Sequence, residues 1–299
     1  MRVFLTGATG FIGSAIVNEL RAAGHETLGL ARSDASAGAL AKAGVEVHRG
    51  ELSNTASLVA GATACEGVIH TGFIHDFSQY AANIETDRLA VAAMARALEG
   101  SGKPLVIASG TGMVAFGRTG GQTATEADAP VSEAVPRAAS EALVLAASGR
   151  GVRGAVVRLP PTVHGAGDKG FIPWMIGFAR EKGHAAYIGE GVNRWPAVHR
   201  LDAARVFRLA LERAAPGTRL HAVAEEGVPL RAVAEAIGAG LGLPVRSLTA
   251  DEAPDYFGFL AMFASMDNPT SSALTREALG WGPEGPDLLS DMRENGYFA

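Results

Sequence analysis

Residues 6–13 read TGATGFIG. They follow the apolar run RVFLT, which is typical of a buried strand, and they open the amphipathic pattern FIGSAIVNELRAA, which is typical of a helix. In this context Gly7 permits a tight turn, Gly10 lets the backbone approach a pyrophosphate, and Gly13 lets the helix pack closely on the strand. Free N–H groups at the helix start then face the phosphates. The octet predicts a dinucleotide-binding turn, and the alternative is a glycine-rich turn that binds nothing.

The pattern continues beyond this turn as apolar runs that alternate with helical stretches. The runs are continuous in Val, Ile and Leu, as expected for strands buried on both faces of a parallel sheet. Right-handed crossovers then predict an α/β fold, a Rossmann-type doubly wound parallel sheet. We expect strands at 2–6, 26–31, 45–48, 67–70, 104–109 and 153–159, and helices at 11–23, 81–100 and 137–149.

The pattern loosens after the two prolines at 160 and 161, which indicates a second unit. We expect residues 1–160 to form the cofactor-binding Rossmann domain and residues 161–299 to form mainly a smaller C-terminal substrate-binding lobe. The strong helical pattern at 201–214 is expected to return to the sheet. Further helices are expected near 171–182, 228–242 and 252–265. The last is rich in aromatic residues, which favours core or subunit contact first and a hydrophobic substrate wall second.

Composition narrows the class of protein. The chain has 299 residues, 47% of them hydrophobic, and no apolar run reaches the ~20 residues that cross a bilayer. Its single cysteine, Cys65, excludes a disulfide scaffold, and histidine spacing gives no metal signature, so no metal is expected. A net charge of −5 argues against nucleic acid or an anionic membrane as partner. We expect a cytoplasmic protein, with no signal peptide, that binds a small-molecule substrate.

The end of the second expected strand bears on the choice of cofactor. It reads LGLARSD, so Ala31 stands where an acid usually meets a free ribose 2′-hydroxyl. Arg32 and Ser33 follow, and the guanidinium of Arg32 is a planar donor for a 2′-phosphate. The sequence therefore predicts NADPH/NADP⁺, with NADH the less favoured cofactor. The alternative is that Arg32 is a solvated surface residue.

The glycine turn and four further segments resemble the extended short-chain dehydrogenase/reductase superfamily, the branch of NAD-dependent epimerase/dehydratase-like proteins. The segments are RGEL (49–52), GVIHTG (67–72), VVRLPPTVHGAGD (156–168) and AVHRLDAARVFRLALE (197–212). This resemblance spans nearly the whole chain and implies a homodimer and a bound dinucleotide. The implied cofactor contacts are Gly7, Thr9, Gly10, Phe11, Ile12, Gly13, Arg32, Ser33, Glu51, Leu52, Thr71, Gly72, Arg137, Pro160 and Val163.

The chain departs from the superfamily at the acid-base pair. Members normally carry Tyr-x-x-x-Lys on the helix after the fifth strand, where the tyrosine transfers a proton and the lysine lowers its pKa. Alignment on Glu141 places Arg137 at the lysine position and Glu133 at the tyrosine position. None of the four tyrosines is followed by lysine at that spacing. Arg137 can hold the cofactor or serve as a structural helix-start residue, but it cannot donate a proton near neutral pH.

Other positions of the usual catalytic set differ as well. Gly110 stands near the expected substrate-orienting hydroxyl, with Ser109 and Thr111 as its neighbours. Asp87 replaces the asparagine of the usual proton relay, and we expect it to organise the site rather than to transfer a proton. The resemblance therefore implies an atypical member of the superfamily.

Histidines offer a different source for the proton. His75, in the loop HTGFIHDFSQY at 70–80, is the first candidate, because an imidazole titrates near neutral pH. Asp76 is its neighbour. His164 and His199 are further candidates, with a structural role as the alternative for each. The expected catalytic residues are His75, Thr111, Ser109, Arg137 and His199, and Arg194 and Trp195 are expected in the substrate lobe.

Three functions remain open on these observations. The first is an NADPH-dependent reductase of a small carbonyl, or of an imine or enone, with non-standard proton donation. The second is a non-catalytic NADP(H)-binding sensor or scaffold. The third is a nucleotide-sugar epimerase or dehydratase, which depends most heavily on the tyrosine.

Overall fold

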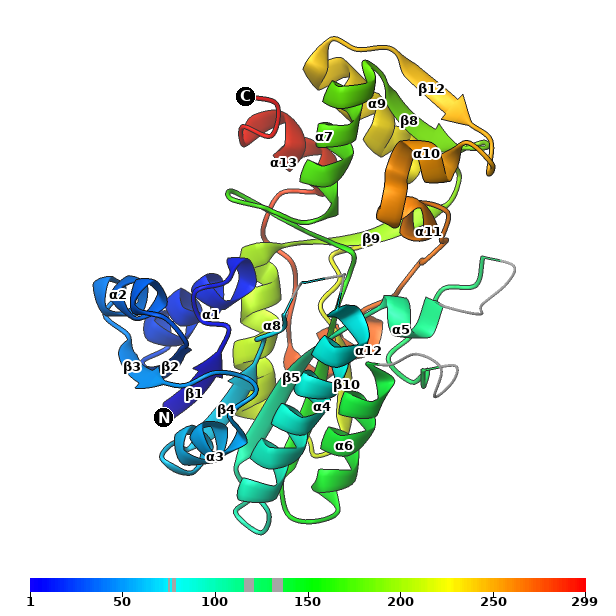
Figure 1. Cartoon of the computed structure of the whole chain (residues 1–299). Coiled ribbons are helices and arrows are strands. Elements are labelled where there is room, and N and C mark those ends of the chain that lie inside the picture. The colour runs from blue at the N-terminus through cyan, green and yellow to red at the C-terminus, as the bar shows by residue number, and fades with distance from the viewer. Residues whose placement is uncertain (75, 77–78, 116–120, 131–136) are drawn as a thin grey trace.

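The computed structural model describes residues 1–74, 76, 79–115, 121–130 and 137–299. Figure 1 shows a larger lobe built on a central sheet and a smaller lobe above it. A short three-stranded sheet connects the two, in the order β11 (Glu225–Pro229), β9 (Arg194–His199) and β7 (Thr162–His164).

The central sheet has seven strands, all parallel, in the order β10-β6-β5-β4-β1-β2-β3. The order reverses between β1 and β4, and this switch point is where open α/β sheets bind ligands. The expected Rossmann-type fold is confirmed. The strands are β1 (Arg2–Thr6), β2 (Glu26–Ala31), β3 (Glu46–Arg49), β4 (Gly67–His70), β5 (Pro104–Gly110), β6 (Arg153–Leu159) and β10 (Thr218–His221).

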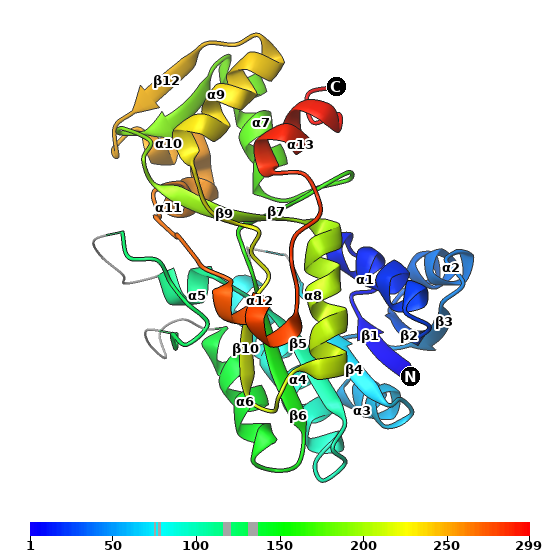
Figure 2. The same ribbon diagram turned by 180° about the vertical axis from the view of Figure 1, so that it is seen from behind.

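Helices cover both faces of this sheet because successive strand residues point to opposite sides. Val3 and Leu5 of β1 face a core formed with α1 and α8, whereas Phe4 faces a second core formed with α3, α4 and α6. Figures 1 and 2 show the two layers from opposite sides. The helices of this lobe are α1 (Phe11–Ala22), α2 (Asp34–Lys42), α3 (Thr55–Thr63), α4 (Tyr80–Ala97), α5 (Gly112–Ala115), α6 (Ala138–Ser148), α8 (Arg200–Arg213) and α12 (Ala273–Leu279).

The chain passes more than once between the lobes. As expected, α8 returns to the sheet, where it packs on α1, and α12 packs on α8. The strand β10 joins the sheet beside β6 and was not expected from the sequence. The smaller lobe contains α7 (Phe171–Lys182), β8 (Ala185–Ile188), α9 (Leu230–Leu241), β12 (Val245–Leu248), α10 (Ala253–Phe257), η2 (Gly258–Leu260), α11 (Ala261–Ala264) and α13 (Leu288–Glu294).

The helix expected over 252–265 is not continuous. Gly258 has φ +53°, in the left-handed region, and it ends α10 there. A 3₁₀ turn and the short α11 follow. The prediction of one aromatic helix was therefore wrong, because the apolar pattern hides the break at a single glycine.

Candidate cofactor and active site

The glycine turn lies at the carboxyl end of β1. Gly7 has φ +74°, and the Gly10 N–H donates to the Gly7 carbonyl at 2.9 Å. A Cβ on Gly13 would lie 2.0 Å from that carbonyl oxygen, so only glycine permits this approach of helix to strand. Among the described residues no side chain caps the start of α1, and its first turn carries no acid. The free N–H groups therefore fit a pyrophosphate.

The residues that follow β4 pack against the same glycine turn. The Thr71 hydroxyl donates to the Thr6 carbonyl at 2.9 Å, and the Gly72 N–H donates to the Thr6 hydroxyl at 3.1 Å. A Cβ on Gly7 would lie 2.8 Å from the Gly72 nitrogen. Thr71 and Gly72, both expected at the cofactor, thus line the turn directly.

Arg200 supplies a cation beside this turn that the sequence did not indicate. Its guanidinium lies 4.8 Å from the centre of the Phe11 ring and donates to the Ser14 hydroxyl at 3.3 Å. Thr9 and Gly10 are exposed next to it. Since Ser14 lies in the first turn of α1, Arg200 adds positive charge where the turn would hold phosphate.

The remaining expected cofactor contacts lie around the carboxyl edge with differing exposure. Ile12 and Val163 pack against the core of the α1 and α8 face. Glu51 is exposed, whereas Pro160 is buried at the end of β6. The side chain of Leu52 lies beside Gly72, because a Cβ on that glycine would approach it to 3.2 Å.

The end of β2 leaves Arg32 exposed. Within the described part of the chain, Arg32 makes no hydrogen bond or ion pair. Its neighbour Ser33 is engaged as the N-cap of α2, where its hydroxyl accepts the Ser36 N–H at 3.2 Å. The other nearby cation, Arg49, forms an ion pair with Asp34. Arg32 is therefore the available guanidinium at this strand end.

Ser109 is committed to a buried ion pair. Its hydroxyl donates to Glu141 Oε1 at 2.6 Å. The guanidinium of Arg158 binds both oxygens of the same carboxylate, at 3.0 and 2.7 Å. Arg158 and Glu141 are 0% and 1% exposed, so this network holds β5, α6 and β6 together at the carboxyl edge of the sheet. The Ser109 proton is engaged there.

Thr111 is likewise buried and hydrogen-bonded. Its hydroxyl accepts from the amide of Asn268 at 2.8 Å, and Asn268 in turn accepts from the Thr270 hydroxyl at 3.0 Å. Asn268 comes from the segment that follows α11, far along the chain. No pattern in the sequence indicated this contact.

Arg137 precedes α6 and reaches the carboxyl edge of β5. Its guanidinium lies 4.3 Å from the centre of the Phe73 ring and donates weakly to the Ala108 carbonyl at 3.4 Å. Phe73 also contacts Tyr80, with ring centres 6.4 Å apart. The structure thus brings Arg137, Phe73 and Tyr80 together beyond the ends of β4 and β5.

A buried series of hydrogen bonds links α6, α4, β4 and β1 at the carboxyl edge of the sheet. Asp87 on α4 accepts from the Ser140 hydroxyl at 2.7 Å and from His70 Nε2 at 3.2 Å. His70 Nδ1 lies 2.7 Å from the Thr6 hydroxyl, so the hydrogen-bonded chain extends to the end of β1. Burial alone would raise the pKa of Asp87, but the hydrogen bonds from His70 and Ser140 and the charge of Arg137 outweigh it and lower that pKa.

The other two histidine candidates lie on a different face. His164 is buried and its Nδ1 lies 2.8 Å from Asp291 on α13, and burial lowers the pKa of its imidazole. His199 packs against it, with ring centres 5.6 Å apart. His164 thus contacts α13, whereas His199 lies against Gly285 of the C-terminal segment and against Gly165, which also adjoins Arg200; within the described residues no contact joins either histidine to Ser109, Thr111 or Arg137.

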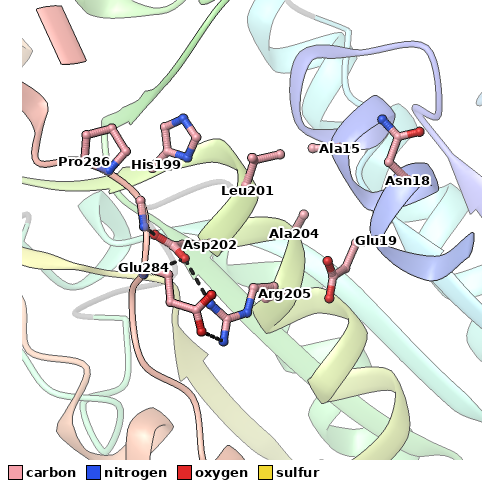
Figure 3. Close-up of a pocket in the computed structure, with 11 residues that line it drawn as sticks. Ala15, Asn18, Glu19, His199, Leu201, Asp202, Ala204, Arg205, Glu284 and Pro286 are labelled. Atoms are coloured by element: carbon pink, nitrogen blue, oxygen red, sulfur yellow. Dashed lines mark hydrogen bonds and ion pairs between the residues drawn. The ribbon is translucent and has the colours of Figure 1, made fainter. Parts of the chain in front are cut away.

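His199 also lines a pocket of about 440 Å³ between α1, α8 and the C-terminal segment, shown in Figure 3. The pocket borders the second and third turns of α1, at Ala15, Asn18 and Glu19, rather than the glycine turn. Arg205 and Asp202 form an ion pair at its edge. His75 and Glu133 lie outside the described residues.

The carboxyl group of Asp168 is buried and has a raised pKa. Burial is the largest cause that raises its pKa from 3.8 to about 6, although the Gly170 N–H and the Tyr297 hydroxyl at 3.0 Å both donate to it. The folded protein therefore holds a proton here that the unfolded chain releases above pH 3.8. The contribution of this proton to the free energy of unfolding is fully present below pH 3.8, and it is lost as the pH rises through about 6.

Asp168→Asn is expected to remove this dependence, because an amide stays neutral at every pH. Relative to the wild type, the variant should gain free energy of unfolding as the pH rises from 4 to 7 in urea denaturation, roughly in proportion to the pKa shift. Asp251→Asn, at an exposed aspartate, is the control. Parallel pH profiles for Asp168→Asn and the wild type would contradict the assignment.

Comparison with known proteins agrees with this geometry. The family model for the NAD dependent epimerase/dehydratase family matches residues 3–223. The chain belongs to this family. It is an extended short-chain dehydrogenase/reductase, a member of an oxidoreductase family that binds NAD(H) or NADP(H).

Relatives of this epimerase/dehydratase-family protein align with most or all of its length. An uncharacterized protein of Schizosaccharomyces pombe is 46% identical over 298 residues and 100% of both chains. The 2-alkyl-3-oxoalkanoate reductase of Stenotrophomonas maltophilia is 28% identical and aligns with 82% of this chain and 77% of its own. The structure of MoeE5 in complex with UDP-glucose and NAD is similar in fold, with TM-score 0.76, 22% identity and coverage of 100% and 98%.

The described residues contain neither a helix able to span a bilayer nor a cluster of side chains able to hold a metal ion. None of their helices combines the length and apolar character needed to span a bilayer. Among the same residues, no group of three or more His, Cys, Asp or Glu side chains could hold a metal ion.

Proposed function

We propose that this protein is an NADPH-dependent reductase of a small carbonyl compound, or of an imine or enone. The proposal rests on one observation above all: an unpartnered Arg32 at the end of β2, beside a glycine turn whose N–H groups are free. A strand end that binds the free ribose 2′-hydroxyl of NADH usually carries an acidic residue at the position of Ala31. Arg32 provides a donor fork for a 2′-phosphate instead.

Different residues around the carboxyl edge of the sheet would bind different parts of the dinucleotide. The bound dinucleotide supplies the hydride. The glycine turn and Arg200 would hold its pyrophosphate, and Arg32 its 2′-phosphate. Arg137 would hold the nicotinamide ribose and offset the negative charge that develops on the substrate oxygen.

Two points favour a reductase over the other two functions: the name of one relative, and the glutamate that the sequence alignment puts at the superfamily's tyrosine position. The Stenotrophomonas maltophilia relative is named as a reductase of a 3-oxo acid. Epimerases and dehydratases of nucleotide sugars depend on acid-base catalysis at the position that Glu133 takes here. One observation favours a sensor: the hydroxyls of Ser109 and Thr111 are buried and engaged. A cytoplasmic location and a homodimer stay predictions.

Arg32→Ala tests the cofactor assignment. We expect the NADPH dissociation constant to rise about 10- to 100-fold, which corresponds to the loss of one charge-assisted contact of about 1.4–3 kcal/mol, while NADH affinity stays unchanged. Fluorescence titration with both cofactors measures this. Arg246→Ala removes another exposed, uncontacted arginine of the described chain and should change neither affinity. Equal losses for NADPH and NADH in Arg32→Ala would refute the assignment.

The reductase itself is tested by NADPH oxidation across a panel of aldehydes, ketones, imines and enones. Turnover of at least one class is expected. Tight NADPH binding without turnover on any of them would favour the sensor.

A further inference from the structure

The cation beside the glycine turn, Arg200, is held by contacts on two sides. On one side its guanidinium lies 4.8 Å from the centre of the Phe11 ring and donates to the Ser14 hydroxyl at 3.3 Å, both in the first turn of α1. On the other side its Nη1 donates to the Ala166 carbonyl at 2.7 Å. Within the described residues Arg200 forms no other hydrogen bond or ion pair, so N–H donors remain for an anion at the turn.

The loop that supplies this carbonyl follows β7 and packs along the Arg200 side chain. A Cβ on Gly165 would lie 2.9 Å from both Cγ and Cδ of Arg200, so the loop backbone touches the aliphatic part of the arginine. Gly165 has φ +137° and Gly167 has φ +82°, which are conformations that other residues rarely adopt. Because two such glycines allow the loop many conformations, contacts from elsewhere must select the one in which Ala166 meets Arg200.

Tyr297 supplies such contacts from the segment that follows α13. Its hydroxyl accepts the Gly165 N–H at 3.0 Å and donates to Asp168 Oδ2 at 3.0 Å, so one side chain joins both ends of the loop 165–168. Asp168 also accepts the Gly170 N–H at 2.6 Å, and its own N–H donates to the Gly165 carbonyl at 3.0 Å. Figures 1 and 2 show this loop between α13 and the start of α1.

The segment that carries Tyr297 is itself anchored on both sides of that residue. Before it, Asp291 on α13 lies 2.8 Å from Nδ1 of buried His164, the residue that precedes the loop. After it, the Phe298 carbonyl accepts from the Arg180 guanidinium on α7 at 3.0 Å. The Tyr297 hydroxyl is therefore a fixed point against which the loop is held.

We propose that Tyr297 is a positioning residue for cofactor binding, which fixes the loop 165–168 so that Ala166 orients Arg200 toward the pyrophosphate of the dinucleotide. The inference rests on the proposed function, but only on its dinucleotide binding and not on a catalytic step. A guanidinium that is already held in its binding orientation loses less side-chain entropy when the phosphates bind. No pattern in the sequence indicated this role, because Tyr297 and Gly165 lie 132 residues apart.

Tyr297→Phe removes the hydroxyl and keeps the ring. We expect the dissociation constants of NADPH and NADH to rise by the same factor, about 3- to 10-fold, because both dinucleotides carry the pyrophosphate. Fluorescence titration measures both constants. Tyr256→Phe is the matched control, since it removes a hydroxyl of the same lobe that donates to the His184 carbonyl at 2.5 Å, and it should leave both constants unchanged.

A double-mutant cycle separates positioning of Arg200 from a general structural role. Arg200→Ala is expected to weaken binding of both dinucleotides by itself. Adding Tyr297→Phe to Arg200→Ala should change neither constant by more than about twofold, because the tyrosine acts through the arginine. Unchanged affinity in Tyr297→Phe alone, or the same loss with and without Arg200, would overturn the proposal.

Hydrogen exchange follows the loop itself. If the fixed loop helps NADPH to bind, bound NADPH must stabilise the fixed loop by the same factor. We expect saturating NADPH to slow amide exchange over residues 165–168 in the wild type and to have less effect in Arg200→Ala. Equal slowing in the two proteins, or none in the wild type, would contradict the proposal.

All these readouts measure binding rather than turnover. A wild type that binds NADPH but reduces nothing would refute the reductase and leave this test intact. A wild type that binds neither NADPH nor NADH would overturn both the proposed function and the role of Tyr297.

Discussion

Gly13→Ala is expected to abolish NADPH binding and to lower the free energy of unfolding by about 3 kcal/mol. The added Cβ would lie 2.0 Å from the Gly7 carbonyl oxygen and 2.7 Å from its carbon, so backbone rather than a side chain must move. Any shift of α1 away from β1 also displaces the N–H groups that face the phosphates.

Gly38→Ala is the control for this effect. Gly38 lies in α2 with nothing within 4 Å of the added Cβ, so alanine should stabilise the helix by about 0.5–1 kcal/mol. Urea denaturation and NADPH fluorescence titration measure both consequences. Near-normal NADPH affinity in Gly13→Ala would show that the close approach of helix to strand is not what shapes the turn.

Arg158→Ala is expected to lower the free energy of unfolding by about 3–5 kcal/mol, because it removes the guanidinium that binds both oxygens of buried Glu141 and leaves only Arg219, at 4.0 Å, as a cation among the described residues. The two side chains are 0% and 1% exposed, so water cannot take the place of the guanidinium. The Ser109 hydroxyl would remain the chief donor to that carboxylate.

Arg150→Ala breaks an ion pair that is exposed to solvent, in contrast to the buried pair of Arg158 and Glu141. Arg150 and Glu99 pair at 2.6 Å, but their side chains are 47% and 35% exposed, so the loss should stay below about 1 kcal/mol. Denaturant unfolding of both variants gives the comparison. Similar small losses in the two would show that the buried ion pair adds no more stability than the exposed one.

The sequence predicted the sheet well because a buried parallel strand is encoded locally. Runs such as RVFLT and PLVIAS need only their own residues to signal burial on both faces. The strand β10 was not predicted because its sequence, TRLH, is short and contains two polar residues and a cation. It is a strand through its pairing with β6, which no local pattern encodes.

The cofactor turn was predictable for the same reason, since strand, glycines and helix are contiguous. The surroundings of the reacting groups were not. Ser109 and Thr111 were correctly located at the end of β5, but their partners Glu141 and Asn268 lie 32 and 157 residues away in the chain. Only the folded arrangement shows that both hydroxyls are engaged. Likewise, only the folded arrangement shows that Arg137 and Tyr80 both contact Phe73.

The positions of the candidate residues in the fold differ from what the sequence suggested for the active site. In the sequence, Glu133 and Arg137 stand at the positions of the superfamily's tyrosine and lysine, so histidines became the candidate proton donors. His164 and His199 lie against α13 and the C-terminal segment instead. The carboxyl ends of β4 and β5, with the start of α4, form the edge that a substrate would meet.

Transfer of deuterium from labelled NADPH shows whether the protein delivers the cofactor's hydride to a substrate. The protein is incubated with each C4-deuterated form of NADPH in turn and with the carbonyl, imine and enone panel, and the products are examined by mass spectrometry. A reductase must yield a product that gains one deuterium from one of the two forms and none from the other. Absence of deuterium from every product with both forms, while NADPH binds tightly, would contradict the account.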